Sequence, residues 1–378
     1  MTRAVEAEPI AIVQERLARL RRWAAQNGLD GILLRKRRSF AWLTMGRCNH
    51  IVWTTEEGVA DLLIFHDRAF CVTTRMESDR IKEEELAGLG FEMIASEWTE
   101  GVLPILRRLC AGKKIGADVW PDALGIESAV YMGDALFRLT YVLEKEEIRR
   151  YAWLCRQAAM AVEETCREIR PGMSEWEIQS RLAEKILPHG IFPQVILVAT
   201  DERVFRYRHP IPTAKPLERY AMMVLCAEKW GLVANVTRLV HFGPLPKTLS
   251  DRRWKLAEID LTMNLATRPG VPIRDVLRAG IEAYRRVGHP DDWRYLHQGG
   301  PTGYATREFL ATPDCEGVVQ LHQAFAWNPS LPGIKSEDTI WVDKQANHFL
   351  THTGNWPYII MERDGQVYQR PDILVIQQ

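Results

Sequence analysis

A long charged segment, residues 143–169, divides the sequence into two parts with different patterns. The segment is predicted to form a helix that ends at Pro171-Gly172. Before it, strand and helix patterns alternate, which is typical of a small α/β domain. After it, helices are combined with antiparallel strands, which indicates an α+β domain. We therefore predict an α/β N-terminal domain over residues 1–142 and an α+β C-terminal domain over residues 143–378.

Hydrophobic periodicity and turn residues predict the main elements of both domains. In the first domain they are helices over residues 10–27 and 77–86 and strands over residues 31–34, 60–65, 69–73 and 88–94. In the second domain they are helices over residues 174–186, 251–267 and 273–287 and strands over residues 194–199, 221–226, 232–240, 325–328 and 339–342. Ser174 is the predicted N-cap of its helix, and Glu177 completes a capping box.

The composition argues against several classes of protein. The 49 basic and 49 acidic residues cancel, so no overall field favours a nucleic acid or an anionic membrane. No apolar run approaches the roughly 20 residues that span a bilayer, and residues 1–22 have no continuous apolar core like that of a signal peptide. Seven cysteines without paired spacing fit a reduced chain better than a disulfide framework. We expect a cytoplasmic protein with no nucleic-acid or membrane partner.

Six short stretches of the second domain match the motifs of one family, in the family's order. They are residues 143–148 (LEKEEI), 170–175 (RPGMSE), 209–213 (HPIPT), 231–238 (GLVANVTR), 297–304 (HQGGPTGY) and 333–339 (GIKSEDT). This set resembles the pita-bread fold of creatinase, prolidase, aminopeptidase P and methionine aminopeptidase. Residues 40–43 and 73–85 similarly resemble the small N-terminal domain of the two-domain members. The resemblance implies a creatinase-like α/β N-terminal domain followed by a pita-bread domain of the catalytic type.

Most positions that hold metal ligands in this family carry other residues here. The peptidases bind two divalent ions with two aspartates, one histidine and two glutamates. The first aspartate falls within residues 224–227 (VLCA), which contain no acid, and the second falls at Asn235. The histidine position is Pro301, the first glutamate position is Asn328, and only Glu337 keeps its acid. One carboxylate cannot neutralise two dications in a partly buried site, so we predict no metal and no other cofactor.

His209 and Glu337 are the predicted catalytic residues. Creatinase implies that this fold can cleave a C–N bond without a metal, and His209 matches its acid–base histidine, although creatinase keeps its acid at the position of Asn328 instead of Glu337. A neutral imidazole near pH 7 is suited to proton transfer. A lone buried carboxylate at Glu337 would have a raised pKa and could act as an acid or a base. The alternatives are a structural histidine and a carboxylate that Arg238 holds in a salt bridge.

The predicted substrate-binding residues are polar or charged and fall in or near the same motifs: His297, Tyr304, Arg307, Glu308, Asn235, Asn328 and Arg238. Arg307 is the predicted substrate clamp; with Glu308 it could bind a carboxylate or a guanidinium, and a surface ion pair is the alternative. Asn235 and Asn328 are predicted orienting amides that keep the shape of the lost acids without their charge. Cys226 is predicted to be a buried strand residue, since a nucleophilic thiol would need exposure and a lowered pKa.

These residues favour a metal-independent hydrolase that acts on a C–N bond of a small amino-acid-like or guanidino compound. One alternative is a non-catalytic module that binds peptides in the degenerate site, as in chromatin chaperones with this fold, although the neutral charge balance argues against that version. Another is a peptidase with a single metal held by His209, His297, Glu308 and Glu337. The predicted partner is a small-molecule or short-peptide substrate, and the resemblance to the two-domain branch implies a homodimer.

Overall fold

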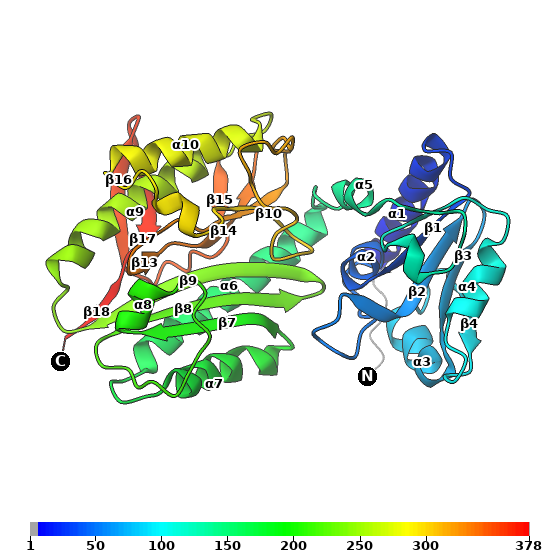
Figure 1. Ribbon diagram of the computed structural model, residues 1–378, viewed down its shortest axis with the longest axis horizontal. Helices are drawn as coiled ribbons and strands as arrows, with labels where there is room; N and C mark the ends of the chain where they lie inside the picture. The colour runs from blue at the N-terminus through cyan, green and yellow to red at the C-terminus, as the bar shows by residue number, and fades with distance from the viewer. Residues whose placement is uncertain (1–6, 378) are drawn as a thin grey trace. The chain divides into compact units, whose positions relative to one another are not determined.

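The computed structural model describes residues 7–377, and these form two compact units. The first unit ends at Thr140 and the second begins at Tyr141, whereas the sequence pattern suggested a boundary after residue 142. Each unit has its own sheet structure, and each is described separately (Figure 1). Within the described residues, no helix combines the length and the apolar character that crossing a bilayer requires.

The N-terminal unit is built on one six-stranded mixed sheet of order β4-β3-β2-β1-β5-β6 (Figure 1). Its strands are β1 (Gly31–Lys36), β2 (Glu57–Phe65), β3 (Ala69–Thr74), β4 (Glu92–Ser96), β5 (Ile115–Ala117) and β6 (Ala129–Tyr131). Its helical segments are α1 (Ala7–Gln26), α2 (Arg37–Leu43), α3 (Arg75–Arg80), η1 (Ile81–Glu85), α4 (Leu103–Cys110), η2 (Pro121–Ala123) and α5 (Gly133–Arg138). Leu33, Leu63 and Leu106 belong to a buried aliphatic cluster that joins the sheet to α4.

The C-terminal unit combines two four-stranded sheets with two short two-stranded ladders within residues 141–377. The orders are β18-β9-β8-β7, β10-β11-β14-β15, β12-β13 and β16-β17. The strands are β7 (Phe192–Thr200), β8 (Tyr220–Lys229), β9 (Leu232–Phe242), β10 (Gly299–Thr302), β11 (Ala324–Trp327), β12 (Ser330–Leu331), β13 (Ile334–Lys335), β14 (Asp338–Val342), β15 (Asn347–Phe349), β16 (Tyr358–Arg363), β17 (Gln366–Pro371) and β18 (Leu374–Ile376). The helical segments are α6 (Lys145–Glu168), α7 (Glu175–Ile186), η3 (Leu187–His189), α8 (Glu202–Arg206), α9 (Lys247–Ala266), α10 (Ile273–Arg286) and η4 (Asp292–Tyr295).

Helices cover the long β7–β8–β9 sheet, which supplies the frame of the second unit. In Figure 1, α6 and α7 pack along this sheet, and α9 packs beside α10 near β13 and β17. The helix α7 begins with Ser174 as N-cap, and the Ser174–Glu177 capping box confirms that prediction. The backbone of Thr237 on β9 pairs with Glu337 just before β14. This bridge, with the hydrogen bonds between Asn235 on β9 and Thr339 on β14, ties the two four-stranded sheets together, and the candidate site lies beside it.

The β8–β9 hairpin turns as tightly as two antiparallel strands can. Lys229 pairs with Leu232, and the two residues between them, Trp230 and Gly231, both have positive φ, of 57° and 75°. This is the pattern of a two-residue primed turn, for which glycine is suited at the second position. Because the turn fixes the register, Cys226 pairs with Asn235 across the hairpin. Cys226 therefore lies opposite the position that matches the family's second aspartate.

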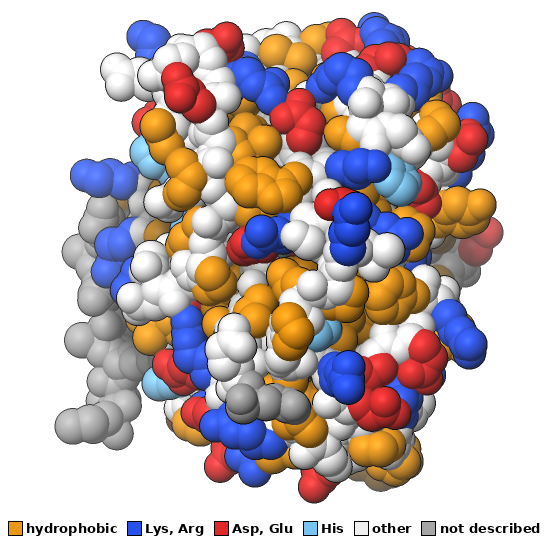
Figure 2. All heavy atoms as spheres, turned by 90° about the vertical axis from the view of Figure 1, so that its left-hand side faces the viewer, with side chains coloured by type: hydrophobic (Ala, Val, Ile, Leu, Met, Phe, Trp, Pro, Cys, Tyr) orange, Lys and Arg blue, Asp and Glu red, His pale blue; other side chains and the backbone are white. Residues whose placement is uncertain are grey.

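The elements predicted from the sequence are present, with shifts at some ends. The expected strand over residues 88–94 begins later, as β4 at Glu92, because Gly88 and Gly90 take positive φ in the turn before it. The expected helix over residues 77–86 is α3 followed by a π-helical segment, η1. Basic and acidic side chains are interspersed over the face drawn in Figure 2, as the balanced net charge suggests.

Candidate functional site

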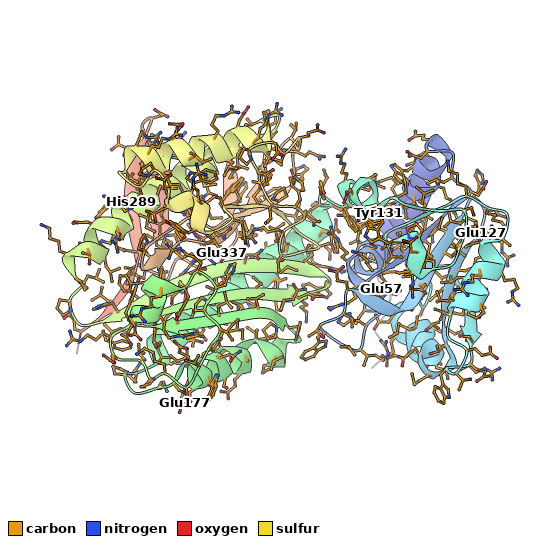
Figure 3. All side chains as sticks on the ribbon, in the orientation of Figure 1. Glu57, Glu127, Tyr131, Glu177, His289 and Glu337 are labelled. Carbon is orange, nitrogen blue, oxygen red and sulfur yellow. The ribbon has the colours of Figure 1, made fainter. Side chains whose placement is uncertain are left out.

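A carboxylate bound by two side-chain cations forms the centre of the candidate site. Both oxygens of Glu337 are engaged: Oε1 lies 2.8 Å from Nη2 of Arg307, and Oε2 lies 2.7 Å from Nζ of Lys335. The hydroxyl of Thr237 on β9 also donates to Oε2 at 2.8 Å. We call these four residues the Glu337 cluster; Figure 3 shows Glu337 beside β9. The side chains of Arg307, Lys335 and Glu337 are at most 8% exposed.

The charge state of Glu337 differs from the one predicted. Burial alone would raise the pKa of Glu337, but the ammonium of Lys335 and the guanidinium of Arg307 outweigh burial and lower it to about 2. The expectation of a raised pKa is therefore wrong, because the sequence argument took the carboxylate to be alone. Glu337 is an anion at any ordinary pH, and an anion of such low basicity is a poor proton acceptor. Its position suits it to hold the two cations in place.

Two histidines lie within the electrostatic reach of the Glu337 cluster. The rings of His209 and His297 are 5.8 Å apart between centroids and inclined by 47°. Burial lowers the pKa of His209, and Lys335 and Arg307 lower it further against the opposing effect of Glu337. Burial and Arg307 lower the pKa of His297 to about 4. His209 is the exposed member of the pair, and Nδ1 of His297 is buried without a hydrogen-bond partner among the described residues.

The two asparagines at lost acid positions bind different neighbours. Asn328 accepts a hydrogen bond from Nη2 of Arg307 at 3.1 Å and donates to the backbone oxygen of His297 at 3.0 Å. It thereby orients the arginine of the Glu337 cluster, which is consistent with an orienting amide. Asn235 donates instead to Oγ1 of Thr302 at 3.0 Å and to the backbone oxygen of Val233 at 3.2 Å. Oδ1 of Asn235 is buried without a hydrogen-bond partner in residues 7–377.

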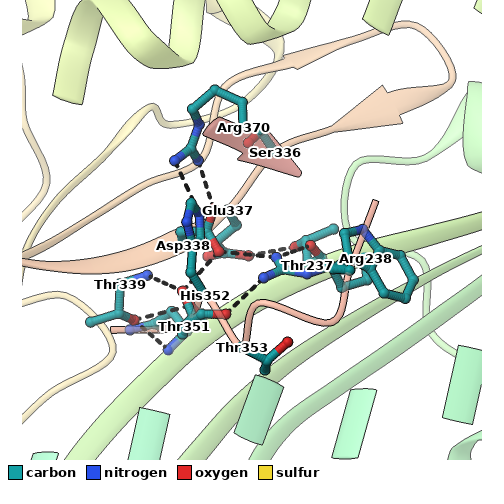
Figure 4. A network of polar contacts seen from close by, with 12 residues as sticks. Thr237, Arg238, Ser336, Glu337, Asp338, Thr339, Thr351, His352, Thr353 and Arg370 are labelled. Atoms are coloured by element: carbon teal, nitrogen blue, oxygen red, sulfur yellow. Dashed lines mark hydrogen bonds and ion pairs between the residues drawn. The ribbon is translucent and has the colours of Figure 1, made fainter. Parts of the chain in front are cut away.

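Arg238 follows Thr237 on β9, so its side chain points to the opposite face of that strand, where it belongs to a second polar network. Its guanidinium lies 3.0 Å from Oδ1 of Asp338 and 3.4 Å from Oε1 of Glu163, and it is fully buried. Arg370 binds Oδ2 of Asp338 at 2.6 Å, and Nε2 of His352 lies 3.3 Å from the same oxygen (Figure 4). The proposed salt bridge between Arg238 and Glu337 is therefore wrong. Asp338 and Glu337 point away from each other, as neighbours along a strand do.

Of the remaining predicted substrate residues, Arg307 belongs to the Glu337 cluster, whereas Tyr304 and Glu308 bind other partners. Tyr304 is buried, and its hydroxyl donates to Glu147 at the start of α6. Glu308 accepts from the backbone N–H of Tyr304 at 2.9 Å and closes a short turn. Arg307 directs its side chain to Glu337 and Asn328. The ion pair that Arg307 makes is therefore a buried one with Glu337, and not the surface pair that was the alternative to a substrate clamp.

Cys226 faces the same region but does not act as a reactive thiol. Its side chain is buried, and burial followed by the charge of Glu337 raises the pKa of Cys226 to about 12. A thiol with such a pKa is protonated and unreactive at neutral pH. This agrees with the prediction of a buried strand cysteine. Lys335, in contrast, was absent from the predicted site, although it stands two residues before Glu337 in the GIKSEDT stretch.

Comparison with protein families identifies the two units. Residues 146–344 match the family described as Metallopeptidase family M24, and residues 16–145 match the family described as Creatinase/Prolidase N-terminal domain. The first match alone covers more than half of the chain. The chain belongs to metallopeptidase family M24. The expected creatinase-like N-terminal domain and pita-bread C-terminal domain are confirmed, and the M24 family is a family of hydrolases.

Several solved structures with the same fold are prolidases and dipeptidases. The prolidase of Pyrococcus horikoshii OT3 has a TM-score of 0.77 and 17% identity, with 90% of this chain and 98% of that chain covered. The Xaa-Pro dipeptidase of Bacillus anthracis has a TM-score of 0.76 and 19% identity, with 96% and 100% covered. The prolidase of Thermococcus sibiricus has a TM-score of 0.78 and 16% identity, with 96% and 99% covered. No curated protein sequence matches the chain.

The residues of this M24 chain do not fit the pair of divalent ions that the family uses. Hard cations need several oxygen ligands with negative charge. Glu337 is the one acid left at the matching positions, and both of its oxygens already bind side-chain cations. Among residues 7–377, no group of three or more His, Cys, Asp or Glu residues is placed to hold a metal ion. The structure therefore does not favour the alternative of a single metal held by His209, His297, Glu308 and Glu337, since Oε1 of Glu308 binds the backbone N–H of Tyr304.

Proposed function

We propose that this M24 chain is a metal-independent hydrolase that cleaves a C–N bond in a small amino-acid-like or guanidino substrate. One observation carries the proposal: Lys335 and Arg307 bind both oxygens of Glu337. Glu337 stands at the one family metal-ligand position that still carries an acid in this chain. Fixed side-chain cations can stabilise negative charge that develops on a substrate oxygen or nitrogen. Hydrolysis is expected from the fold. The absence of a metal from the reaction is expected from the Glu337 cluster, because side-chain cations occupy both oxygens of Glu337.

His209 is the proposed proton-transfer residue. Its side chain lies at the surface but is partly buried, and this partial burial together with the nearby cations lowers its pKa, so the imidazole is neutral near pH 7. A neutral imidazole can accept a proton from water while the water oxygen bonds to the substrate carbon. The same proton then passes to the leaving nitrogen as the C–N bond breaks. The products are a free amine and a compound in which the carbon carries the hydroxyl group from water. Glu337 keeps Lys335 and Arg307 oriented and takes no proton in this scheme.

The other residues have supporting roles in the proposal. Asn328 orients Arg307 through the bond to Nη2, and Arg307 is the clamp for the substrate. His297, with an unpartnered buried Nδ1, is a proposed substrate contact. Tyr304, Glu308 and Asn235 shape the neighbouring turn and strand. We also expect a homodimer, which light scattering after gel filtration would test.

The deciding experiment is an assay of protein purified without chelator. Metal content is measured first, and hydrolysis is then tested on Xaa-Pro dipeptides, other dipeptides and creatine-like amides, before and after dialysis against EDTA. The proposal expects turnover of at least one compound, unaffected by EDTA and lost in His209→Ala. The matched control is His189→Ala, because His189 is an exposed histidine at the end of η3. Turnover that requires a divalent ion, or that survives His209→Ala, would refute the proposal.

A further inference from the structure

The charged groups of the Glu337 cluster do not balance. Lys335 and Arg307 supply two positive charges and Glu337 supplies one negative charge, so one positive charge remains uncompensated in a buried place. The two histidines beside it do not change this count, because His297 has a pKa of about 4 and His209 a lowered one. A buried net charge is costly unless a group of opposite sign accompanies it. Counted over its four members, the cluster therefore carries one surplus positive charge; the neighbouring carboxylate of Glu308 binds the backbone N–H of Tyr304.

The second network is bound to other partners. The carboxylates of Asp338, Glu163 and Asp260 contact Arg238, Arg370 and Ser336, and among the described residues none of the three contacts Lys335 or Arg307. Lys335, Arg307 and Glu337 are the charged residues that act on His209, and His297 responds to the same three and to His209. At both histidines Lys335 and Arg307 lower the pKa, and Glu337 raises it. The local field at the exposed edge of the cluster is therefore positive.

Donors in the cluster are left without acceptors. An ammonium has three N–H groups, and Glu337 is the one acceptor of Lys335 among the described residues. Nε of Arg307 is buried and has no acceptor within residues 7–377. Beside the cluster, Nδ1 of His297 is also buried without a hydrogen-bond partner among the described residues. Buried donors are nearly always paired in folded proteins, so these unpaired groups point to a ligand with acceptor oxygens.

We propose that the Glu337 cluster binds the carboxylate of the substrate, through Lys335 and Arg307 directly. One uncompensated positive charge is matched by a monoanion. A phosphate dianion would leave a buried negative charge, and a divalent cation would add two positive charges to the one already present. Guanidinium and ammonium groups form short, charge-assisted hydrogen bonds with carboxylate oxygens. The inference rests on the proposed function and specifies its substrate class, which is compounds with a free carboxylate next to the C–N bond that is cleaved.

Acetate binding to the full chain tests this proposal without any turnover. Isothermal titration calorimetry at neutral pH would compare acetate, inorganic phosphate and Mn²⁺ as separate probes. Acetate should bind, and more tightly than phosphate or Mn²⁺. Lys335→Met removes the surplus charge and should weaken acetate binding about tenfold, whereas Glu337→Gln doubles the surplus and should strengthen it about tenfold. Lys344→Met, at an exposed lysine, is the matched control and should leave the affinity unchanged.

The opposite responses of the two variants make the test decisive. If the cluster bound a cation instead, Glu337→Gln would weaken the binding of that cation, because the substitution removes its one carboxylate ligand. Equal acetate affinity in wild type and Lys335→Met, or weaker binding in a folded Glu337→Gln, would refute the proposal. If Glu337→Gln does not fold, Lys335→Arg decides the matter, because it keeps the charge and should keep acetate binding within about threefold. Acetate binding without hydrolysis of any compound would refute the proposed function and leave this site intact.

Discussion

Glu337 and Asp338 are adjacent in the chain, yet their carboxylates bind two separate pairs of cationic side chains. Glu337 binds Lys335 and Arg307, and Asp338 binds Arg238 and Arg370. The alternation of side chains along an extended strand sends the two acids to opposite sides. One acid therefore faces the candidate site, and the other fastens the strand to the core behind it. The two sets should respond to mutation in different ways.

Asp338→Asn should strongly destabilise the C-terminal unit. The substitution removes the one carboxylate that contacts both buried guanidinium groups, those of Arg238 and Arg370. Removing one partner from a buried ion pair costs about 3 to 5 kcal/mol of unfolding free energy. Urea denaturation of the variant would measure the loss, with Asp291→Asn as control because that side chain is 76% exposed. A loss as small as that of the control would show that the network contributes little.

His209→Ala should abolish most of the activity and leave the fold unchanged. A positioned acid–base group contributes about 10²- to 10⁴-fold to the rate, and His209 is exposed, so no core packing is lost. The substitution should lower kcat more than it changes KM. The variant should unfold at the same thermal midpoint as the wild type. Steady-state kinetics beside thermal unfolding would separate the two effects. Equal losses in His209→Ala and His189→Ala would remove His209 from the mechanism.

The pH dependence of kcat/KM should report the same histidine. Burial and the charges of Lys335 and Arg307 lower the pKa of His209 below its usual 6.5. A general base must be unprotonated, so kcat/KM should be constant at neutral pH and fall when the pH drops through that lowered pKa. Lys335→Met removes one cation that lowers the pKa, so its acidic limb should move to higher pH. A limb that stays in place or moves to lower pH in this variant would contradict the assignment.

The sequence predicted the fold well because its signals are local. The capping box of Ser174 and Glu177, the end of α6 before Pro171-Gly172 and the strands around Asn235 each depend on a few neighbouring residues. The order of the motifs then fixed how these elements belong together. Even the register of the β8–β9 hairpin is local, since the Trp230-Gly231 turn determines it.

The electrostatics of the site were less predictable because they depend on contacts between distant residues. Arg307 and Glu337 are 30 positions apart, and their contact joins the segment that follows β10 to the residue just before β14. Lys335 is different, because residues two apart on an extended segment share a face. The spacing of Lys335 and Glu337 could therefore have predicted their ion pair. With that pair included, the predicted pKa of Glu337 would have moved in the opposite direction.

Asn235→Asp restores an acid of the family without restoring a metal site, and the structure predicts its outcome. The amide group donates to the backbone oxygen of Val233 and to Thr302. A buried carboxylate there would face the carbonyl oxygen of Val233 and should cost about 1 to 3 kcal/mol of unfolding free energy. Mn²⁺ should not recover this loss, because Cys226 lies opposite and Glu337 is held by Lys335. Thermal unfolding of wild type and variant, with EDTA and with Mn²⁺, would measure both effects. A midpoint that rises with Mn²⁺ in either protein would show that the cations of the Glu337 cluster do not keep a divalent ion out.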